Sequence, residues 1–299
     1  MSRIHRAGVV VNPVSGAAGR RAGEGSARAD RARRALADLG VAGDVVTTTG
    51  PHQAGAIARD LVDGGAEVVI AWGGDGTVND AATPLVGTST PLGIVRSGSG
   101  DGLGRTLGIP EDPDAAIRGA LSGESRAIDV GYLGSRHFLN VAGIGFDAAV
   151  GQRFNAGARR GQAGYLLRVF EAVWTYRALR YRVRLEHETS DCTRFLVAFA
   201  NGREYGGQLM LAPDADPADG RLDAVIVDDG SAFAQIWRMR RLAFGVRRPA
   251  KGIFRYRVRE ASVAGDRLIC HVDGETFETS GELAVRIAPG ALQIAGIGP

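Results

Sequence analysis

Three short segments of the chain combine glycine with small polar residues, a composition suited to holding an anion through backbone N–H groups. They are 12–16 (Asn-Pro-Val-Ser-Gly), 73–77 (Gly-Gly-Asp-Gly-Thr) and 97–102 (Ser-Gly-Ser-Gly-Asp-Gly). Each follows an apolar run typical of a buried strand, and in an open α/β sheet ligands bind at the carboxyl ends of the strands. N–H groups in glycine-rich turns and at helix starts attract negative charge. The pattern predicts an anion site, and nucleotide phosphate is the commonest such anion.

The basic residues restrict which phosphate chemistry is available. Lys251 is the single lysine among 299 residues, and it follows Ala250. It therefore cannot be the lysine of a Gly-Lys-Ser/Thr phosphate loop or of a protein-kinase strand, and both classes are excluded. Two cysteines rule out a disulfide framework and suit a reducing cytoplasm. A net charge of +3 does not indicate nucleic-acid binding, and we expect neither a secretory signal nor a membrane span.

The pattern of apolar residues changes near residue 128. Before it, expected strands at 9–11, 44–48, 67–72 and 91–95 alternate with helical stretches, which predicts a parallel α/β domain. After it, short alternating apolar runs are separated by Asp-Gly and Gly-Gly turns, which predicts an antiparallel sheet or sandwich. Helices are expected within this second half at about 162–179 and 232–245.

The helix expected at 232–245 mixes aromatic and basic residues, namely Phe233, Trp237 and Phe244 beside Arg238, Arg240, Arg241, Arg247 and Arg248. The favoured interpretation is that its aromatic face packs on a sheet while its arginines are solvated. Contact with an anionic membrane is the alternative.

The three glycine segments also resemble, in order, the motifs of the diacylglycerol kinase catalytic family. That family includes bacterial lipid kinases and the sphingosine and ceramide kinases. Segments 138–147, 201–207, 219–223 and 272–275 agree with the second half of the family pattern, so the resemblance covers essentially the whole chain. The Gly-Gly-Asp-Gly-Thr motif alone also occurs in NAD kinases, and the later segments therefore supply the specificity.

The resemblance implies a two-domain α/β plus all-β fold. A Rossmann-like nucleotide-binding domain with a parallel sheet would span 1–128, a β-sandwich lipid-substrate domain 129–287, and a segment 288–299 would return to the first domain. The active site would lie in the cleft between the domains. The implied activity is ATP- and magnesium-dependent phosphorylation of diacylglycerol or a similar lipid alcohol, by a cytoplasmic protein that transiently contacts the inner face of the membrane. A homodimer is one assembly consistent with it, and a nucleic-acid partner is not expected.

Carried over by position, the resemblance makes Glu275 the general base, with Asp75 and Asp101 as alternatives. Magnesium would lie in a loop with the Asp219 carboxylate and the backbone carbonyls of Asp216 and Arg221. Arg20, Arg21, Arg96 and Arg105 flank the glycine segments and are candidates to supply positive charge. The nucleotide would contact Asn12, Pro13, Ser15, Gly16, Thr48, Gly73, Gly74, Asp75, Gly76, Thr77, Asn79 and Ser99.

Departures from the family pattern leave the substrate open. Ser99 and Gly102 stand where threonine and a second acid are usual in the family. This motif is closer to the one found in sphingosine and ceramide kinases. The alternatives are therefore a sphingosine- or ceramide-type kinase, then an NAD kinase, and then a catalytically silent regulator that binds nucleotide or lipid.

Overall fold

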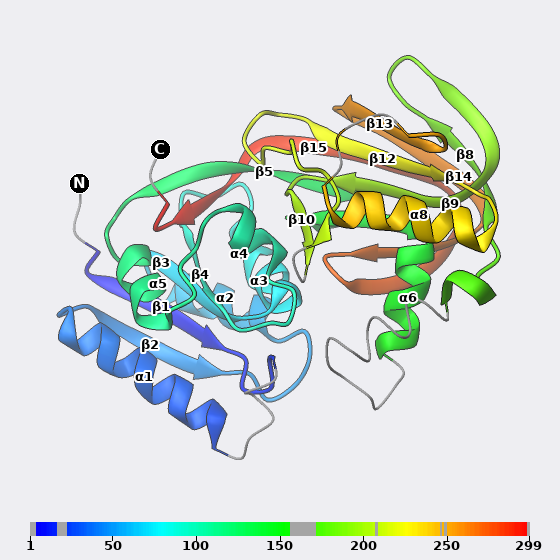
Figure 1. Cartoon of the computed structure of the whole chain (residues 1–299). Coiled ribbons are helices and arrows are strands. Elements are labelled where there is room, and N and C mark those ends of the chain that lie inside the picture. The colour runs from blue at the N-terminus through cyan, green and yellow to red at the C-terminus, as the bar shows by residue number, and fades with distance from the viewer. Residues whose placement is uncertain are drawn as a thin grey trace. The chain divides into compact units, whose positions relative to one another are not determined.

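The computed structural model describes residues 4–16, 23–155, 172–206, 209–245, 247 and 250–297. The chain divides into two compact units, Met1–Ile128 with Gly290–Pro299, and Asp129–Pro289 (Figure 1). The helix expected at 162–179 falls mostly outside the described residues, of which 172–175 are helical.

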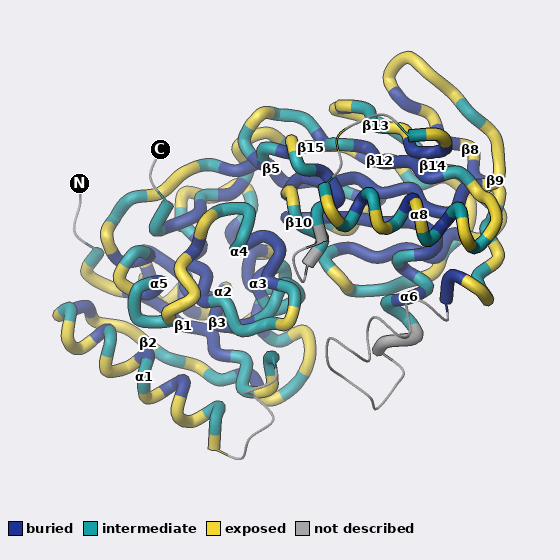
Figure 2. The backbone as a smooth tube through the Cα atoms, in the orientation of Figure 1, coloured by how far each residue is buried: buried dark blue, intermediate teal, exposed yellow. Residues whose placement is uncertain are grey.

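The first unit is built on four parallel strands in the order β4-β3-β1-β2. All six residues of β3 are buried, as its uninterrupted apolar run predicts for a strand covered on both faces (Figure 2). The end of β15 (Glu275–Ala295) joins this sheet, with Ile294 beside Leu92 in parallel. The strands are β1 (Arg6–Val11), β2 (Ala42–Thr47), β3 (Val68–Gly73) and β4 (Leu92–Arg96).

Helices cover this sheet in two pairs. The pair α1 (Glu24–Asp38) and α5 (Pro113–Ala120) are in mutual contact, as are α2 (Ala54–Asp63) and α3 (Asp75–Ala82). Because crossovers between parallel strands are right-handed, the connection from β1 to β2 and that from β3 to β4 run over opposite faces. The chain therefore leaves β1 and β3 in opposite directions, and the topological switch point lies between these two strands.

The second unit confirms the predicted antiparallel domain. Its main path runs β13-β12-β9-β7-β14-β15 with antiparallel neighbours throughout, and β8 pairs with β9 and β14. The elements from β5 to β14 are β5 (Ser125–Leu133), β6 (Arg136–Phe138), β7 (Val141–Gly145), α6 (Phe146–Asn155), β8 (Leu179–Arg184), β9 (Thr189–Ala200), β10 (Glu204–Gly206), β11 (Leu209–Met210), β12 (Leu222–Asp228), α8 (Ala232–Ala243), β13 (Ile253–Val258) and β14 (Glu260–Val272).

Both faces of this sheet carry an apolar core, because successive strand residues point to opposite sides. On β12, Ala224 and Ile226 belong to one core, whereas Val225 and Val227 belong to the other, which includes residues of α6 and α8. Among the described residues, no helix combines the length and the apolar character that crossing a membrane requires.

The structure corrects the interpretation of α8. Phe233 and Trp237 are exposed, whereas Arg238 is buried and donates to the backbone oxygens of Asp228 at 2.8 Å and Lys251 at 3.2 Å. Packing of the aromatic stripe on the sheet was therefore the wrong expectation. A guanidinium that finds backbone acceptors can be buried at modest cost, and these acceptors lie outside α8, 10 and 13 positions from Arg238.

Candidate functional site

The structure brings the three glycine segments together at the switch point of the first unit. The Asn12 side chain donates from Nδ2 to Thr77 Oγ1 at 2.8 Å, which links the turn after β1 to the start of α3. The hydroxyls of Ser15 and Ser97 share a hydrogen bond of 2.6 Å, which links the same turn to the one after β4. These two side-chain hydrogen bonds hold the ends of three strands together.

Glycine is required where these turns meet. Gly16 has a φ of +69°, and a Cβ on it would lie 2.1 Å from the Ser97 carbonyl oxygen. A Cβ on Gly98 would lie 2.8 Å from Gly74 Cα. Such distances are shorter than any side chain permits, so the turns approach one another only because these positions lack one.

The helix α3 starts directly at these turns. Gly74 is its N-cap and supplies no side-chain cap, and Val78 N–H donates back to Gly74 O at 3.0 Å. The first N–H groups of a helix have no acceptor within the helix and carry partial positive charge. Asp75, Gly76 and Thr77 form this first turn, so the segment can receive an anion without a lysine.

The other predicted nucleotide contacts lie at the same strand ends or close to them. Thr48 is buried, and its N–H donates to Val11 O at 2.9 Å, which extends the β1–β2 pairing. Asn79 is half-buried in the next turn of α3, and Ser99 is exposed. Pro13 packs on α1, since a Cβ on Gly25 would lie 2.4 Å from Pro13 Cβ.

Asp101 and Asp75 differ in what surrounds them. Asp101 caps the short helix α4 (Gly102–Thr106) with a φ of 50°, and its carboxylate accepts the Gly98 N–H at 2.8 Å. Burial raises the pKa of the Asp101 carboxyl, while the hydrogen bond from Gly98 lowers it. Asp101 thus holds its own turn in shape, whereas Asp75 is half-buried at the start of α3.

Two of the four arginines predicted to border the phosphates, Arg96 and Arg105, lie beside the third glycine segment. Arg96 donates to Ile109 O at 3.0 Å and pairs with Glu111 at 3.3 Å, so its guanidinium is held by the segment after α4. Arg96 and Arg105 line a cavity of about 610 Å³ together with Ser97, Gly98 and residues of α1. Arg20 and Arg21 lie outside the described residues.

Sequence reasoning missed Arg28, which ties the turns together. It is only 5% exposed, and its Nη1 donates to Asn12 O at 3.1 Å and to Ser15 Oγ at 2.8 Å. Its Nη2 donates to Ser15 O at 3.1 Å, and its Nη1 also reaches Ser97 Oγ at 3.4 Å. A signal was present, because Arg28 lies on the helix face that also carries the buried Ala32 and Leu36.

In the second unit, Glu275 begins β15 directly after a tight turn. Asp273 in that turn has a φ of 46°, and its carboxylate accepts N–H groups of Leu139 (2.7 Å), Asn140 (3.0 Å) and Val141 (2.9 Å). Glu275 is half-buried and pairs with Val272 across the hairpin. The turn that presents Glu275 is therefore fixed by three charge-assisted hydrogen bonds to a distant segment.

Asn201 also holds the segment that contacts the Glu275 hairpin. Its side chain is fully buried and donates from Nδ2 to Asp129 O at 2.9 Å and Leu139 O at 2.8 Å. Asn140 Nδ2 in turn donates to Glu204 O at 2.9 Å. The Asn-Gly-Arg-Glu motif at 201–204 is thus a structural support around the Glu275 hairpin.

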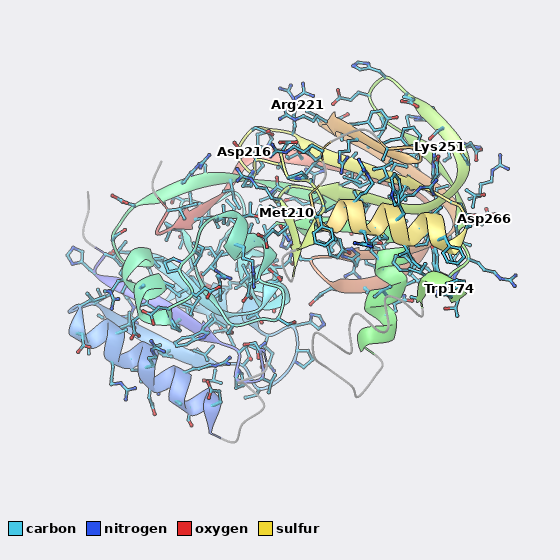
Figure 3. All side chains as sticks on the ribbon, viewed as in Figure 1. Trp174, Met210, Asp216, Arg221, Lys251 and Asp266 are labelled. Carbon is cyan, nitrogen blue, oxygen red and sulfur yellow. The ribbon has the colours of Figure 1, made fainter. Side chains whose placement is uncertain are left out.

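The predicted magnesium loop lies between β11 and β12, where Asp216 and Arg221 are labelled in Figure 3. The Asp216 carboxylate accepts the Ala218 N–H at 3.1 Å. The Asp219 carboxylate accepts the Arg221 N–H at 2.9 Å and pairs with the Arg257 guanidinium. No cluster of three or more His, Cys, Asp or Glu side chains suited to a metal occurs in the described part of the chain. A magnesium ion bound to the Asp219 carboxylate would compete with the Arg257 guanidinium.

Burial also raises the pKa of a neighbouring carboxyl, Asp223, to about 6, against the lowering effect of Arg257 and with a further increase from Asp219. Arg257 thus lies close to both Asp219 and Asp223.

A small apolar cavity of about 70 Å³ lies in the second unit beside a polar cluster that the sequence did not indicate. Asp147 Oδ2 accepts from the Tyr205 hydroxyl at 2.9 Å and lies 3.0 Å from His271 Nε2, and Tyr205 and His271 are themselves in hydrogen-bond contact. Gly143 makes room for the cluster, because a Cβ there would lie 1.8 Å from Asp147 Oδ2. Asp147 and Tyr205 line the cavity with Phe146, Val150, Leu196, Met210, Leu211, Met239, Leu242 and Ala243.

Comparison with known proteins agrees with this arrangement. Residues 6–133 match the family "Diacylglycerol kinase catalytic domain", and residues 140–296 match "YegS C-terminal NAD kinase beta sandwich-like domain". The chain therefore belongs to the diacylglycerol kinase catalytic-domain family of lipid kinases.

Named relatives support the same assignment. A "Diacylglycerol kinase" of Mycobacterium tuberculosis is 34% identical over 245 residues, which cover 77% of this chain and 76% of the relative. A "Probable lipid kinase YegS-like" of Chromohalobacter salexigens is 37% identical over 177 residues, and that match spans 57% of each chain. A crystal structure of a putative diacylglycerol kinase from Bacillus anthracis has a TM-score of 0.82 at 20% identity, covering 100% of this chain and 99% of the other, and shows the shared fold.

The contacts of Arg28 predict a loss of nucleotide affinity when it is replaced. Arg28→Gln should raise the dissociation constant for ATP at least about tenfold, because the turn at 12–16 loses the donors that fix its carbonyls. Arg28→Lys should not restore affinity, since lysine lacks the planar fork of donors. Isothermal titration measures this, with the exposed Arg33→Gln on the same helix as control. A folded Arg28→Gln protein with wild-type affinity would contradict the positioning role.

The anchoring of the Glu275 hairpin predicts that Asp273→Ala destabilises the second unit. Three N–H groups lose a charged acceptor, so the free energy of unfolding should fall by about 3 kcal/mol. Urea unfolding measures this change, and the exposed Asp266→Ala is the matched control. Equal stabilities of the two variants would show that the turn does not depend on Asp273.

Proposed function

We propose that this chain is an ATP-dependent lipid kinase that transfers the γ-phosphoryl group to the hydroxyl of diacylglycerol or a similar lipid alcohol. The observation that carries the proposal is the meeting of three glycine turns and the start of α3 at the switch point of a parallel sheet. Backbone N–H groups at such a point favour a nucleotide phosphate. Membership in a family of lipid kinases supports the same assignment.

Phosphoryl transfer suits a site of this composition. The transferred group carries its charge on oxygen atoms, and catalysis depends mainly on positioning and on neutralising that charge. Asn12 and Thr77 would hold the turns in register, while N–H groups from 74–77 and 97–99 would meet the phosphates. Magnesium would enter with ATP, whose phosphates bind this ion together with few protein ligands.

The apolar cavity of the second unit favours a lipid acceptor. Its lining is almost entirely aliphatic, aromatic or methionine side chains. Each methylene group that enters this small cavity would gain about 0.8 kcal/mol. The Asp147–Tyr205–His271 cluster supplies polar groups at the cavity that could orient a hydroxyl-bearing head group. A soluble dinucleotide would gain little from such a lining, so this cavity favours a lipid kinase over an NAD kinase.

Glu275 is the proposed general base. Its carboxylate would accept the proton of the lipid hydroxyl as the hydroxyl oxygen forms a bond to the γ-phosphorus and the bond to the ADP oxygen breaks. Such proton transfer typically contributes about 10²–10⁴-fold to the rate. The hydrogen bonds of Asp273 support this role, because they fix the turn that carries Glu275.

The substrate is tested by incubating the protein with labelled ATP, Mg²⁺ and, separately, diacylglycerol, sphingosine, ceramide and NAD. We expect label in diacylglycerol. Label in sphingosine or ceramide instead would change the substrate within the lipid class. Label only in NAD, or in nothing, would overturn the proposal.

The base is tested with Glu275→Gln, which should lower kcat by about 10²–10⁴-fold and leave the dissociation constant for ATP unchanged. Glu278→Gln is the matched control, since Glu278 lies on the same strand and is exposed in an ion pair with Arg267 at 2.7 Å. Near-normal turnover of the Glu275 variant would transfer the role of base to Asp75 or Asp101.

A further inference from the structure

The helix α8 presents apolar side chains on two opposite faces. Its inner face carries Leu242, which is buried, and Met239, which packs against the core of α6 and β9. Its outer face carries Phe233 and Trp237, with exposed fractions of 75% and 49%, followed by Phe244 at the helix end with 75%. The spacing of four and seven residues places these three aromatic residues on one side of the helix.

A fourth aromatic side chain extends this outer face. Trp174, labelled in Figure 3, is 51% exposed, and its ring meets that of Phe233 edge to face with centroids 5.5 Å apart. We define the aromatic face as Trp174, Phe233, Trp237 and Phe244. Exposed aromatic groups gathered in this way are uncommon on a protein surface unless they contact a partner.

Positive charge accompanies the aromatic face. The Arg241 guanidinium lies 4.9 Å from the Trp237 ring centroid, and Arg240 is exposed. The sequence of α8, Ala-Phe-Ala-Gln-Ile-Trp-Arg-Met-Arg-Arg-Leu-Ala, contains no acidic residue. Arg238 does not contribute to this surface, because it is buried against backbone carbonyls.

We propose that the aromatic face, with Arg240 and Arg241, binds the surface of an anionic phospholipid membrane. Phenylalanine and tryptophan enter the boundary between head groups and acyl chains, and arginine pairs with anionic head groups. Exposed rings together with positive charge on a helix without acidic residues are complementary in polarity and charge to such a surface.

The two faces of α8 connect this surface to the apolar cavity. Met239, Leu242 and Ala243 line the cavity from the inner side of the helix that carries the aromatic face. A membrane bound on the outer face would place acyl chains beside the helix that borders the cavity. This step of the inference rests on the proposed lipid kinase function, whereas the membrane contact itself does not.

The experiment measures co-sedimentation of the full chain with phosphatidylcholine vesicles, with and without phosphatidylglycerol, in the absence of ATP. The wild type should bind the anionic vesicles, with a blue shift of tryptophan emission because two of its three tryptophans belong to the aromatic face. Phe233→Gln with Trp237→Gln should weaken binding at least about tenfold. Arg240→Gln should weaken it about fivefold on anionic vesicles.

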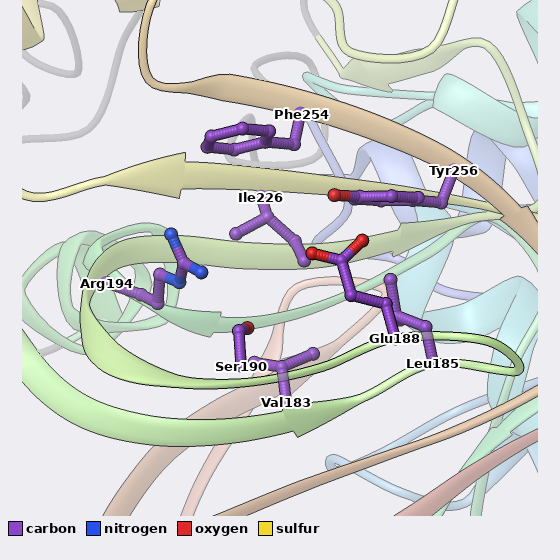
Figure 4. A pocket seen from close by; sticks show the side chains of 8 residues that line it. All are labelled: Val183, Leu185, Glu188, Ser190, Arg194, Ile226, Phe254 and Tyr256. Atoms are coloured by element: carbon purple, nitrogen blue, oxygen red, sulfur yellow. The ribbon is translucent and has the colours of Figure 1, made fainter.

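A matched control is Phe254→Gln. Phe254 is 40% exposed, and on β13 it lies opposite Ile226, so it belongs to the other face of the sheet and to the separate pocket drawn in Figure 4. This variant should bind vesicles as the wild type does.

Three outcomes would overturn the inference: wild-type binding by the Phe233/Trp237 variant, equal binding to neutral and anionic vesicles, or a dimer in sedimentation velocity that this variant dissociates. The last would identify the aromatic face as a contact between two copies. A chain that binds vesicles through this face yet phosphorylates no lipid would overturn the proposed function alone.

Discussion

Close contact of backbone with backbone at the ends of β1, β3 and β4 is the constraint on which the first unit depends. Gly16 and Gly98 leave no room for a Cβ, so the turns touch directly and their N–H groups share one surface. Arg28 then fixes the turn after β1 by donating to the carbonyl oxygens of Asn12 and Ser15 and to the Ser15 hydroxyl. Because the start of α3 meets the same surface, positive potential comes from the backbone rather than from a lysine. A phosphate site formed by backbone N–H groups needs no lysine, which agrees with Lys251 being the single lysine of the chain.

The second unit uses buried polar groups in a comparable way. Asp273 joins the hairpin of Glu275 to a segment more than 130 residues earlier in the chain. Asn201 joins the end of β9 to β5 and to the segment before β7. Each buried acceptor or donor that lost its partner would cost about 1–3 kcal/mol, so these contacts specify one arrangement of the strands. Much of the family resemblance in this half therefore marks residues that hold the hairpin in place, and Glu275 is the residue proposed to act chemically.

The local pattern of apolar residues predicted strands and helices correctly where that pattern was unambiguous. The apolar run at 67–72 corresponds to β3 (Val68–Gly73), and the glycine turn follows it as expected. Contacts between distant residues could not be read in the same way. Arg257 reaches Asp219 from 38 positions away, and it occupies the carboxylate that was predicted to hold magnesium. Periodicity identified the aromatic stripe of α8, but both faces of that helix are apolar, so the pattern alone could not decide which one is buried. The burial of Arg238 against the Asp228 and Lys251 carbonyls decided it.

We propose that contact between the glycine turns creates the nucleotide site, and the affinity of Gly98→Ala for ATP tests this most directly. The added Cβ would lie 2.8 Å from Gly74 Cα and should force the two turns apart. Isothermal titration should then show a dissociation constant at least about tenfold larger than that of the wild type. This is about the effect of losing one good hydrogen bond. Gly119→Ala, where the nearest atom would be 3.6 Å away, should bind as the wild type does. Wild-type affinity in a folded Gly98→Ala protein would contradict the account.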